Sequence, residues 1–134
     1  MSRNRFVEPE VVRLELTEGD WIEVKKELTY GEEQRLAGAA MTSMNIQSDS
    51  DRAKTRTEDG EGVRVNLENE RYAILRLYTW LVDWSFENTA GKRVKVSREA
   101  IANLGADTAH EIDEALTAHI AKREEAKNVA TPTS

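Results

Sequence analysis

The chain has 134 residues, a formal net charge of −6 and a pI of about 5.1, and it contains no cysteine. The missing cysteines exclude disulfides and thiolate metal sites, and the acidic balance argues against nonspecific binding to nucleic acid. One domain is expected over residues 10–126, with flexible ends at 1–9 and 127–134. No apolar run resembles a signal peptide or is long enough to cross a bilayer, so we expect a soluble cytoplasmic protein.

The first predicted element is an antiparallel β-hairpin that pairs residues 11–17 with residues 21–26. Apolar and charged residues alternate in both segments, which is the pattern of half-buried strands. Gly19 and Asp20 suit the tight connection, because glycine tolerates positive φ. An isolated hairpin is marginally stable, so we expect one of its faces to pack on helices.

A helix is predicted to begin after Thr29. Thr29 and Glu32 have the spacing of a capping box, in which each side chain bonds to the other residue's backbone N–H. Residues 47–62 contain no large apolar side chain and are predicted to form a mobile loop. The acidic pair in this loop does not indicate calcium, because arginine and lysine stand where oxygen ligands would be needed.

A central helix is predicted over residues 66–84, with Asn66 as its N-cap. Apolar residues recur along it at helical spacing, and Trp80 widens the stripe that they form. The stripe consists of Ala73, Ile74, Leu77, Leu81 and Trp84. We expect this helix to lie at the centre of the core, with the hairpin packed against it.

Two further helices are predicted after the central one. Ser97 is expected to cap a short helix that ends at Gly105 in a left-handed conformation. A last amphipathic helix follows over residues 107–127, where Thr108 and Glu111 have the spacing of a second capping box. The predicted fold class is therefore α+β and mainly α-helical, with an N-terminal antiparallel hairpin packed on a bundle of about four helices.

No motif predicts catalysis, and we expect no catalytic site, no metal and no cofactor. His110 and Glu114 lie one helical turn apart, but no third ligand accompanies them, so a solvated helix face is the simpler interpretation. No phosphate-binding glycine pattern is present, and Ser85 and Ser97 belong to no nucleophile motif. The basic residues within 92–98 are most simply interpreted as a solvated turn.

Residues 80–86 read WLVDWSF, a concentration of aromatic residues that has two interpretations. Aromatic side chains at helical spacing usually close a core, whereas Trp and Phe are also enriched at the centres of protein interfaces. An exposed apolar patch would in addition favour self-association. The candidate protein-binding residues are Leu77, Trp80, Leu81, Trp84 and Phe86.

The order of these features resembles the tail assembly chaperones of long-tailed bacteriophages. The similarity spans roughly residues 10–122: a hairpin ending in W-I-x-V-K, a helix opened by L-T-Y-G-E, a variable linker, and a helix closing on V-x-D-W-S-F before two smaller helices. The resemblance implies a non-catalytic protein that coats the tape-measure protein, helps to recruit tail-tube subunits in the host cytoplasm and is absent from the mature virion. The basic G-K-R-V-K-V stretch departs from the family's less basic, more proline-rich turn, which leaves the subgroup open.

Two alternatives to a chaperone stay open. One is a structural subunit of the virion, in the tail or the head–tail connector, which would remain in purified particles. The other is a small DNA-binding regulator, suggested by the basic residues within 92–98 and the two helices after them. The net charge of −6 opposes the second alternative, so we expect no binding to nucleic acid.

The resemblance also bears on Ala126, Lys127 and Asn128. In that family, ribosomes commonly slip back one nucleotide near the end of the gene and make a longer product. Ala-Lys-Asn can be encoded with the run A AAA AAC, which suits such a slip, and a disordered tail there would tolerate an added domain. Lys-Asn is also an ordinary dipeptide at a fraying helix end, and an AAG codon for Lys127 would exclude this slip site.

Overall fold

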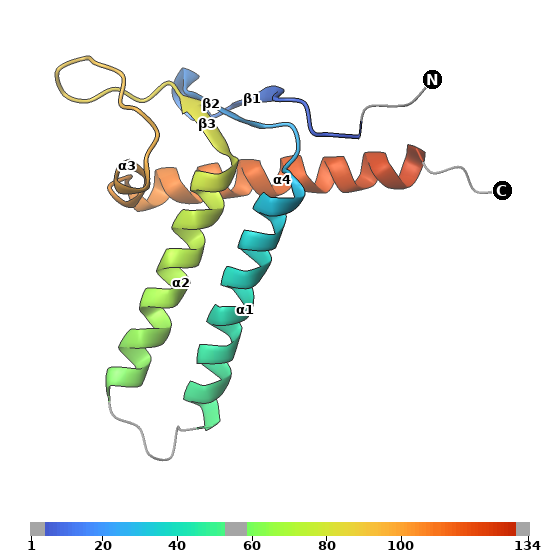
Figure 1. The fold of residues 1–134 in the computed structure, drawn as a ribbon. Helices are drawn as coiled ribbons and strands as arrows, with labels where there is room; N and C mark the ends of the chain where they lie inside the picture. The colour runs from blue at the N-terminus through green and yellow to red at the C-terminus, as the bar shows by residue number, and fades with distance from the viewer. Residues whose placement is uncertain (1–4, 53–58, 131–134) are drawn as a thin grey trace. The chain divides into compact units, whose positions relative to one another are not determined.

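A computed structural model of the chain describes the backbone of residues 5–52 and 59–130, and the side chains of residues 5–42 and 69–126. The fold is α+β and mainly helical, as predicted, with a three-stranded antiparallel sheet in the order β1-β2-β3. The elements in chain order are β1 (Val11–Glu15), β2 (Trp21–Lys25), α1 (Tyr30–Arg52), α2 (Asp59–Trp80), β3 (Leu81–Trp84), α3 (Arg98–Ala102) and α4 (Ala106–Ala130) (Figure 1).

The chain divides into two compact units, each made from two separate stretches. The first unit contains residues 1–10 and 25–80, and the second contains residues 11–24 and 81–134. The first is chiefly the pair of helices α1 and α2, and the second holds most of the sheet together with α3 and α4. Each unit is interrupted by the other along the chain. The single domain expected over 10–126 stays a prediction.

In the first unit, α1 begins with the predicted capping box. The Thr29 backbone N–H donates to Glu32 Oε1 at 3.0 Å, and the Glu32 N–H donates to Thr29 Oγ1 at 3.1 Å. Lys25 Nζ also donates to the Glu32 carboxylate. Partial burial acts to raise the pKa of Glu32, but the hydrogen bonds from Lys25 and Thr29 outweigh it and hold that pKa below its ordinary value.

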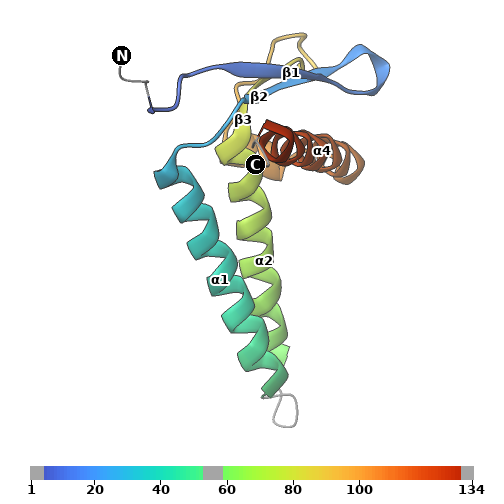
Figure 2. The same cartoon turned by 90° about the vertical axis from the view of Figure 1, so that its right-hand side faces the viewer.

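The mobile loop predicted over 47–62 is wrong at both ends. α1 continues to Arg52 and α2 begins at Asp59, so Asn66 lies inside α2 and is not its N-cap. Residues 53–58 lie outside the described residues. α1 and α2 run antiparallel and side by side (Figures 1 and 2). Packing of one helix on another stabilises helical backbone where the local helix propensity is modest. A loop prediction based on composition does not include that contribution.

In the second unit, β1 and β2 form the predicted hairpin. Leu16 N donates to Asp20 O at 2.8 Å across the connection, which contains a short 3-10 turn at Thr17–Gly19. Gly19 has a φ of 79°, the left-handed conformation that glycine adopts without a steric cost. Ile22 and Val24 are fully buried, whereas their neighbours in β2 are only half-buried, so the alternation predicted from the sequence is confirmed.

The third strand is a departure from the prediction. The helix predicted over 66–84 ends at Trp80, and the next four residues, Leu81–Trp84, pair antiparallel with β2. WLVDWSF is therefore one helix-terminal residue, then a strand, then the start of a loop. β3 is thus an edge strand next to β2, and it places part of the aromatic stretch in the sheet.

A β-bulge explains why the sequence pattern predicted helix here. Ile22 lies opposite Trp84 and Val24 lies opposite Leu81, with a register shift between the two pairs that leaves Val82 as the additional residue. Leu81 and Trp84, three positions apart, thus both reach the buried side of the sheet, while Val82 is exposed. A three-residue spacing is also what a helix produces, so periodicity alone could not separate the two structures.

The short helix α3 begins as predicted but ends differently. Ala100 N donates to Ser97 Oγ at 3.0 Å, which confirms Ser97 as the N-cap. The left-handed stop at Gly105 is wrong, because α3 ends at Ala102 and Gly105 does not have a positive φ. The Gly105 carbonyl instead accepts a hydrogen bond from Ala109 N at 3.0 Å, within the first turn of α4.

Helix α4 lies against one face of the sheet (Figures 1 and 2). The second capping box is wrong: the Glu111 carboxylate accepts hydrogen bonds from Thr17 N at 2.8 Å and Thr17 Oγ1 at 3.1 Å, 94 residues earlier in the chain. A tertiary partner has thus replaced the local one. Buried apolar side chains of the second unit are Ile22, Val24, Leu81, Trp84, Ile101, Ile112 and Leu116.

The prediction of a flexible tail from residue 127 is wrong for residues 127–130, which are helical. α4 continues to Ala130, so Ala126, Lys127 and Asn128 lie within the last two turns of the helix, and residues 131–134 lie outside the described residues. A product lengthened after Asn128 would continue from helical backbone, and whether such a product exists stays a prediction.

Candidate functional site

The structure sorts the five candidate protein-binding residues by burial. Leu77 and Trp80, in the first unit, are buried, as are Leu81 and Trp84 in the second. Phe86, two residues after the end of β3, is half-buried. Four of the five side chains therefore contribute to interiors, and Phe86 is the member of the set with a partly accessible ring.

Phe86 borders an open hollow of about 480 Å³ that lies wholly within the second unit. This volume falls within the range that small binding sites usually occupy, roughly 300–1,000 Å³. Apolar side chains contribute much of the lining, and two carboxylates and an amide stand among them. The lining residues are Trp84, Phe86, Glu87, Val94, Ser97, Glu99, Ala100, Asn103 and Leu104.

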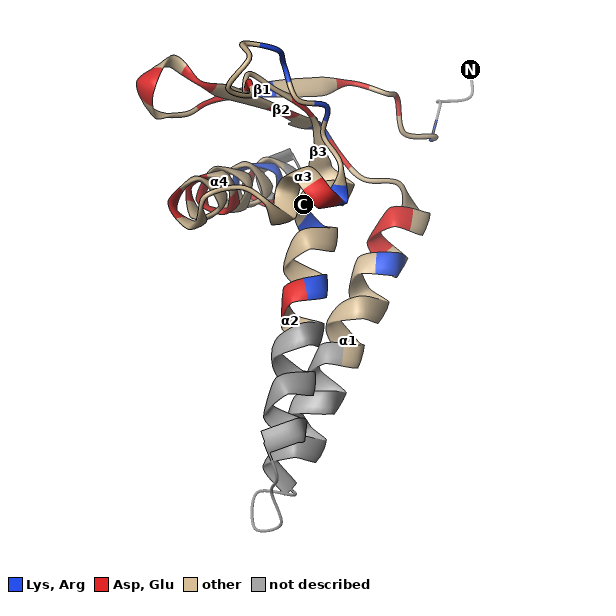
Figure 3. Cartoon of the chain, turned by 90° about the vertical axis from the view of Figure 1, so that its left-hand side faces the viewer, with Lys and Arg blue, Asp and Glu red and all other residues tan. Residues whose placement is uncertain are grey.

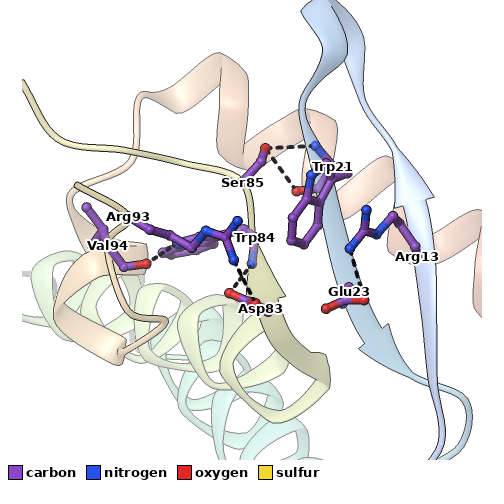
Figure 4. A network of polar contacts seen from close by, with 8 residues as sticks. All are labelled: Arg13, Trp21, Glu23, Asp83, Trp84, Ser85, Arg93 and Val94. Atoms are coloured by element: carbon purple, nitrogen blue, oxygen red, sulfur yellow. Dashed lines mark hydrogen bonds and ion pairs between the residues drawn. The ribbon is translucent and has the colours of Figure 1, made fainter. Parts of the chain in front are cut away.

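Trp84 forms the fixed part of this lining. Its ring is 1% exposed, and its Nε1–H donates to the Val94 carbonyl at 2.6 Å (Figure 4). The Phe86 ring lies against it with centroids 5.2 Å apart and planes tilted by 38°, a favourable arrangement for two aromatic rings. Phe86 is thus held on one side by a buried indole and borders the hollow on the other.

The loop after β3 is built by its own hydrogen bonds. Val94 N donates to Phe86 O at 3.0 Å, and Asn88 N donates to Lys92 O at 2.9 Å. The Asn88 side-chain oxygen accepts from two further backbone N–H groups of the turn, and Gly91 adopts a φ of 77° to close it. These contacts within the loop fix the position of Val94 in the wall of the hollow.

Ser85, next to Phe86, has a structural role. Its Oγ accepts from Trp21 N at 2.9 Å (Figure 4). The same Oγ lies 2.8 Å from Asp20 Oδ1, to which it donates its proton. Ser85 N also donates to Trp21 O at 3.0 Å. These bonds tie the end of β3 to the start of β2.

A second cluster covers the outer side of the sheet. The Arg13 guanidinium lies 3.8 Å from the centre of the Trp21 ring, and that of Arg93 lies 5.2 Å from it (Figure 4). Arg13 bonds to Glu23 and Arg93 to Asp83, each at 3.4 Å. Arg93, expected to belong to a solvated basic turn, is thus engaged with the sheet.

The charged residues that line the hollow differ in sign from the lysines and arginines of the nearby loop. Figure 3 shows Lys and Arg on the loop between β3 and α3, whereas the charged side chains that line the hollow, Glu87 and Glu99, are both acidic. Both carboxylates are exposed, and neither has a hydrogen bond or an ion pair within the described part of the chain. The hollow is therefore lined mainly by apolar residues, and its two charged lining residues, Glu87 and Glu99, which we call its rim, are both acidic.

In the residues that the structure describes, no group of His, Cys, Asp or Glu side chains could hold a metal ion. No helix in that part of the chain is long and apolar enough to cross a membrane. His110 is exposed on α4 and His119 is buried.

Sequence reasoning missed Val94, Asn103 and Leu104 as lining residues, since they lie outside WLVDWSF and belong to no motif.

Comparisons of the chain with protein-family models, with curated proteins and with solved structures found no match.

Proposed function

We propose that this chain is a non-catalytic tail assembly chaperone of a long-tailed bacteriophage, which binds the tape-measure protein and assists assembly of the tail tube. The proposal starts from the order of sequence features that resembles this family. The observation that supports it most directly is the preformed hollow beside Phe86, at the end of the tryptophan-containing signature.

The residues of the signature divide between folding and a free surface. Trp84 is buried and bonded to Val94, and Ser85 is bonded to β2. Phe86 has no polar group to satisfy and only part of its ring is covered. A half-exposed aromatic ring on a rigid support is the kind of anchor that protein interfaces concentrate at their centres. A chaperone that releases its client needs such a surface to stay folded when the client is absent.

The test uses the whole chain and the tape-measure protein encoded by the same phage. Co-expression should keep the tape-measure protein soluble, and the two should co-purify. Phe86→Ala should weaken this association by tenfold or more, because truncating a central aromatic anchor commonly costs 2 kcal/mol or more. Val82→Ala is the matched control, since Val82 is 45% exposed on the adjacent strand and does not line the hollow.

Analysis of purified virions separates the chaperone from the structural alternative. We expect the chain in infected cells and not in mature particles. Its presence in particles at stoichiometric amounts would contradict the proposal and favour a tail or connector subunit. Retention on DNA with a steep salt dependence would instead favour a regulator. Concentration-dependent self-association that Phe86→Ala abolishes, without binding to the tape-measure protein, would assign the hollow to a second copy of the chain.

A further inference from the structure

We infer that the hollow beside Phe86 recognises a client segment in which an apolar side chain stands next to a lysine or arginine. This inference rests on the proposed function for the identity of the client, but its chemistry follows from the hollow itself. The apolar side chain would enter between Phe86, Val94 and Leu104, and the cation would lie at the rim beside Glu87 and Glu99.

The apolar part of the inference follows from the lining. Trp84 is buried in the lining, and Phe86, Val94 and Leu104 are half-buried lining residues. Burial of apolar surface is favourable in proportion to the area removed from water, so an aliphatic or aromatic side chain gains most from entering here. Asn103, which is exposed at the same opening, carries both a donor and an acceptor for the client's backbone.

Carboxylates of the second unit differ in whether they have a partner within the chain, and this difference favours a basic residue in the client. Glu23 and Asp83 are paired with arginines, and Glu111 accepts two hydrogen bonds from Thr17. Glu87 and Glu99 reach the rim from the loop and from α3, and neither has such a partner within the described residues. An incoming cation would meet two carboxylates that no intramolecular contact neutralises.

The nearby basic run does not cancel this negative rim. The lining of the hollow contains no lysine or arginine. Arg93 directs its guanidinium to Asp83 and over Trp21, on the outer side of the sheet. The chain as a whole carries a net charge of −6, which would also attract a basic segment during its approach.

Hydrogen bonds within the chain fix the lining of the hollow. Hydrogen bonds from Trp84 Nε1 to Val94 O and from Val94 N to Phe86 O hold the two sides of the opening together. Little conformational entropy is then lost at this surface on binding, which favours a short segment as the ligand.

The experiment measures binding of the full chain to an array of overlapping 15-residue peptides that covers the tape-measure protein of the same phage. The peptides retained should be those that contain an apolar residue beside lysine or arginine. For each one, replacement of the basic residue by glutamate, and separately of the apolar residue by serine, should reduce binding at least tenfold. Equal binding of the glutamate-substituted peptides would overturn the inference.

The variant Glu87→Gln/Glu99→Gln tests the rim directly. It should weaken binding of the basic peptides about five- to tenfold at low salt, as expected for two exposed charge pairs, and should reduce the salt dependence. Its matched control is Glu15→Gln/Glu114→Gln, which makes the same change in net charge at two exposed carboxylates away from the hollow. Equal loss in both double variants would reduce the effect to overall charge and overturn the inference.

Failure of this inference can be told apart from failure of the proposed function. If the tape-measure protein co-purifies with the chain but the rim variant and the substituted peptides bind unchanged, the chaperone proposal stands and the apolar–basic preference is wrong. If the tape-measure protein does not bind but unrelated peptides with a Leu-Arg pair bind and those with Leu-Glu do not, the chemistry of the hollow stands and the assigned client is wrong. Binding of none of these peptides overturns the inference outright.

Discussion

Replacement of Trp84 by phenylalanine tests whether the indole joins β3 to the loop that bounds the hollow. The ring is 1% exposed, and its Nε1–H donates to the Val94 carbonyl at 2.6 Å. Phenylalanine keeps an aromatic ring but removes two ring carbons and the nitrogen. Alanine would be a less informative substitution, because a loss of about 3–5 kcal/mol could unfold a domain of ordinary stability and hide the contribution of the hydrogen bond.

The expected magnitude has two parts. Loss of two buried ring carbons costs about 1.5 kcal/mol, at roughly 0.8 kcal/mol for each buried carbon group. Loss of the donor to Val94 costs about 1 kcal/mol, near the low end for an abandoned acceptor because Val94 is only half-buried and water can reach it. We therefore expect Trp84→Phe to lower the free energy of unfolding by about 2.5 kcal/mol.

Urea unfolding followed by far-UV circular dichroism measures this change, which should appear as a lower midpoint at an unchanged m-value. Trp21→Phe is the matched control. Trp21 is half-buried, its ring is flanked by Arg13 and Arg93, and its Nε1 has no hydrogen bond to the described part of the chain. The control should lose about 1 kcal/mol or less. Equal losses in the two variants, or a loss below about 1 kcal/mol for Trp84→Phe, would refute the structural role of the indole.

Three other predictions concern the helices. Thr29→Ala should cost about 1 kcal/mol through loss of the N-cap of α1, whereas Thr42→Ala, at an exposed position inside the same helix, should be neutral or slightly stabilising in thermal unfolding. Because hydrogen bonds hold the pKa of Glu32 below its ordinary value, its contribution to stability is present above about pH 5 and is lost as the pH falls through the lowered pKa. Glu32→Gln should therefore show a smaller loss of stability than the wild type between about pH 5 and pH 3. Glu111→Ala should cost about 1 kcal/mol by releasing the β1–β2 connection, and Glu114→Ala, exposed on the same helix, should cost less than half of that.

The features that could be predicted from the sequence are those that depend on near neighbours in the chain. The Thr29–Glu32 capping box and the Ser97 cap are made by groups three residues apart, so their geometry is complete once the helix begins. The hairpin could be predicted for a similar reason, since its alternation and its turn lie within a single stretch. Gly19 adopts the positive φ that the tight connection requires.

The features that could not be predicted depend on partners far along the chain. Thr108 and Glu111 have the spacing of a capping box, yet the Glu111 carboxylate bonds to Thr17, and no local rule anticipates a donor 94 residues away. β3 needs β2 as its partner, and its bulge reproduces a helical spacing between Leu81 and Trp84. In both places a tertiary interaction replaced the structure that the local pattern favours.

The same reasoning explains why the sequence singles out the aromatic stretch but does not predict which of its rings are buried and which are partly exposed. The indole N–H of Trp84 has to find an acceptor once the ring is buried, and it finds Val94, 10 residues later. Ser85 has to satisfy a hydroxyl, and its partners lie 64 and 65 residues earlier. Phe86 carries no such requirement, so its ring can stay partly exposed without leaving a polar group unpaired. Of these three neighbours it is therefore the one whose side chain can face solvent or a partner without leaving a polar group unpaired.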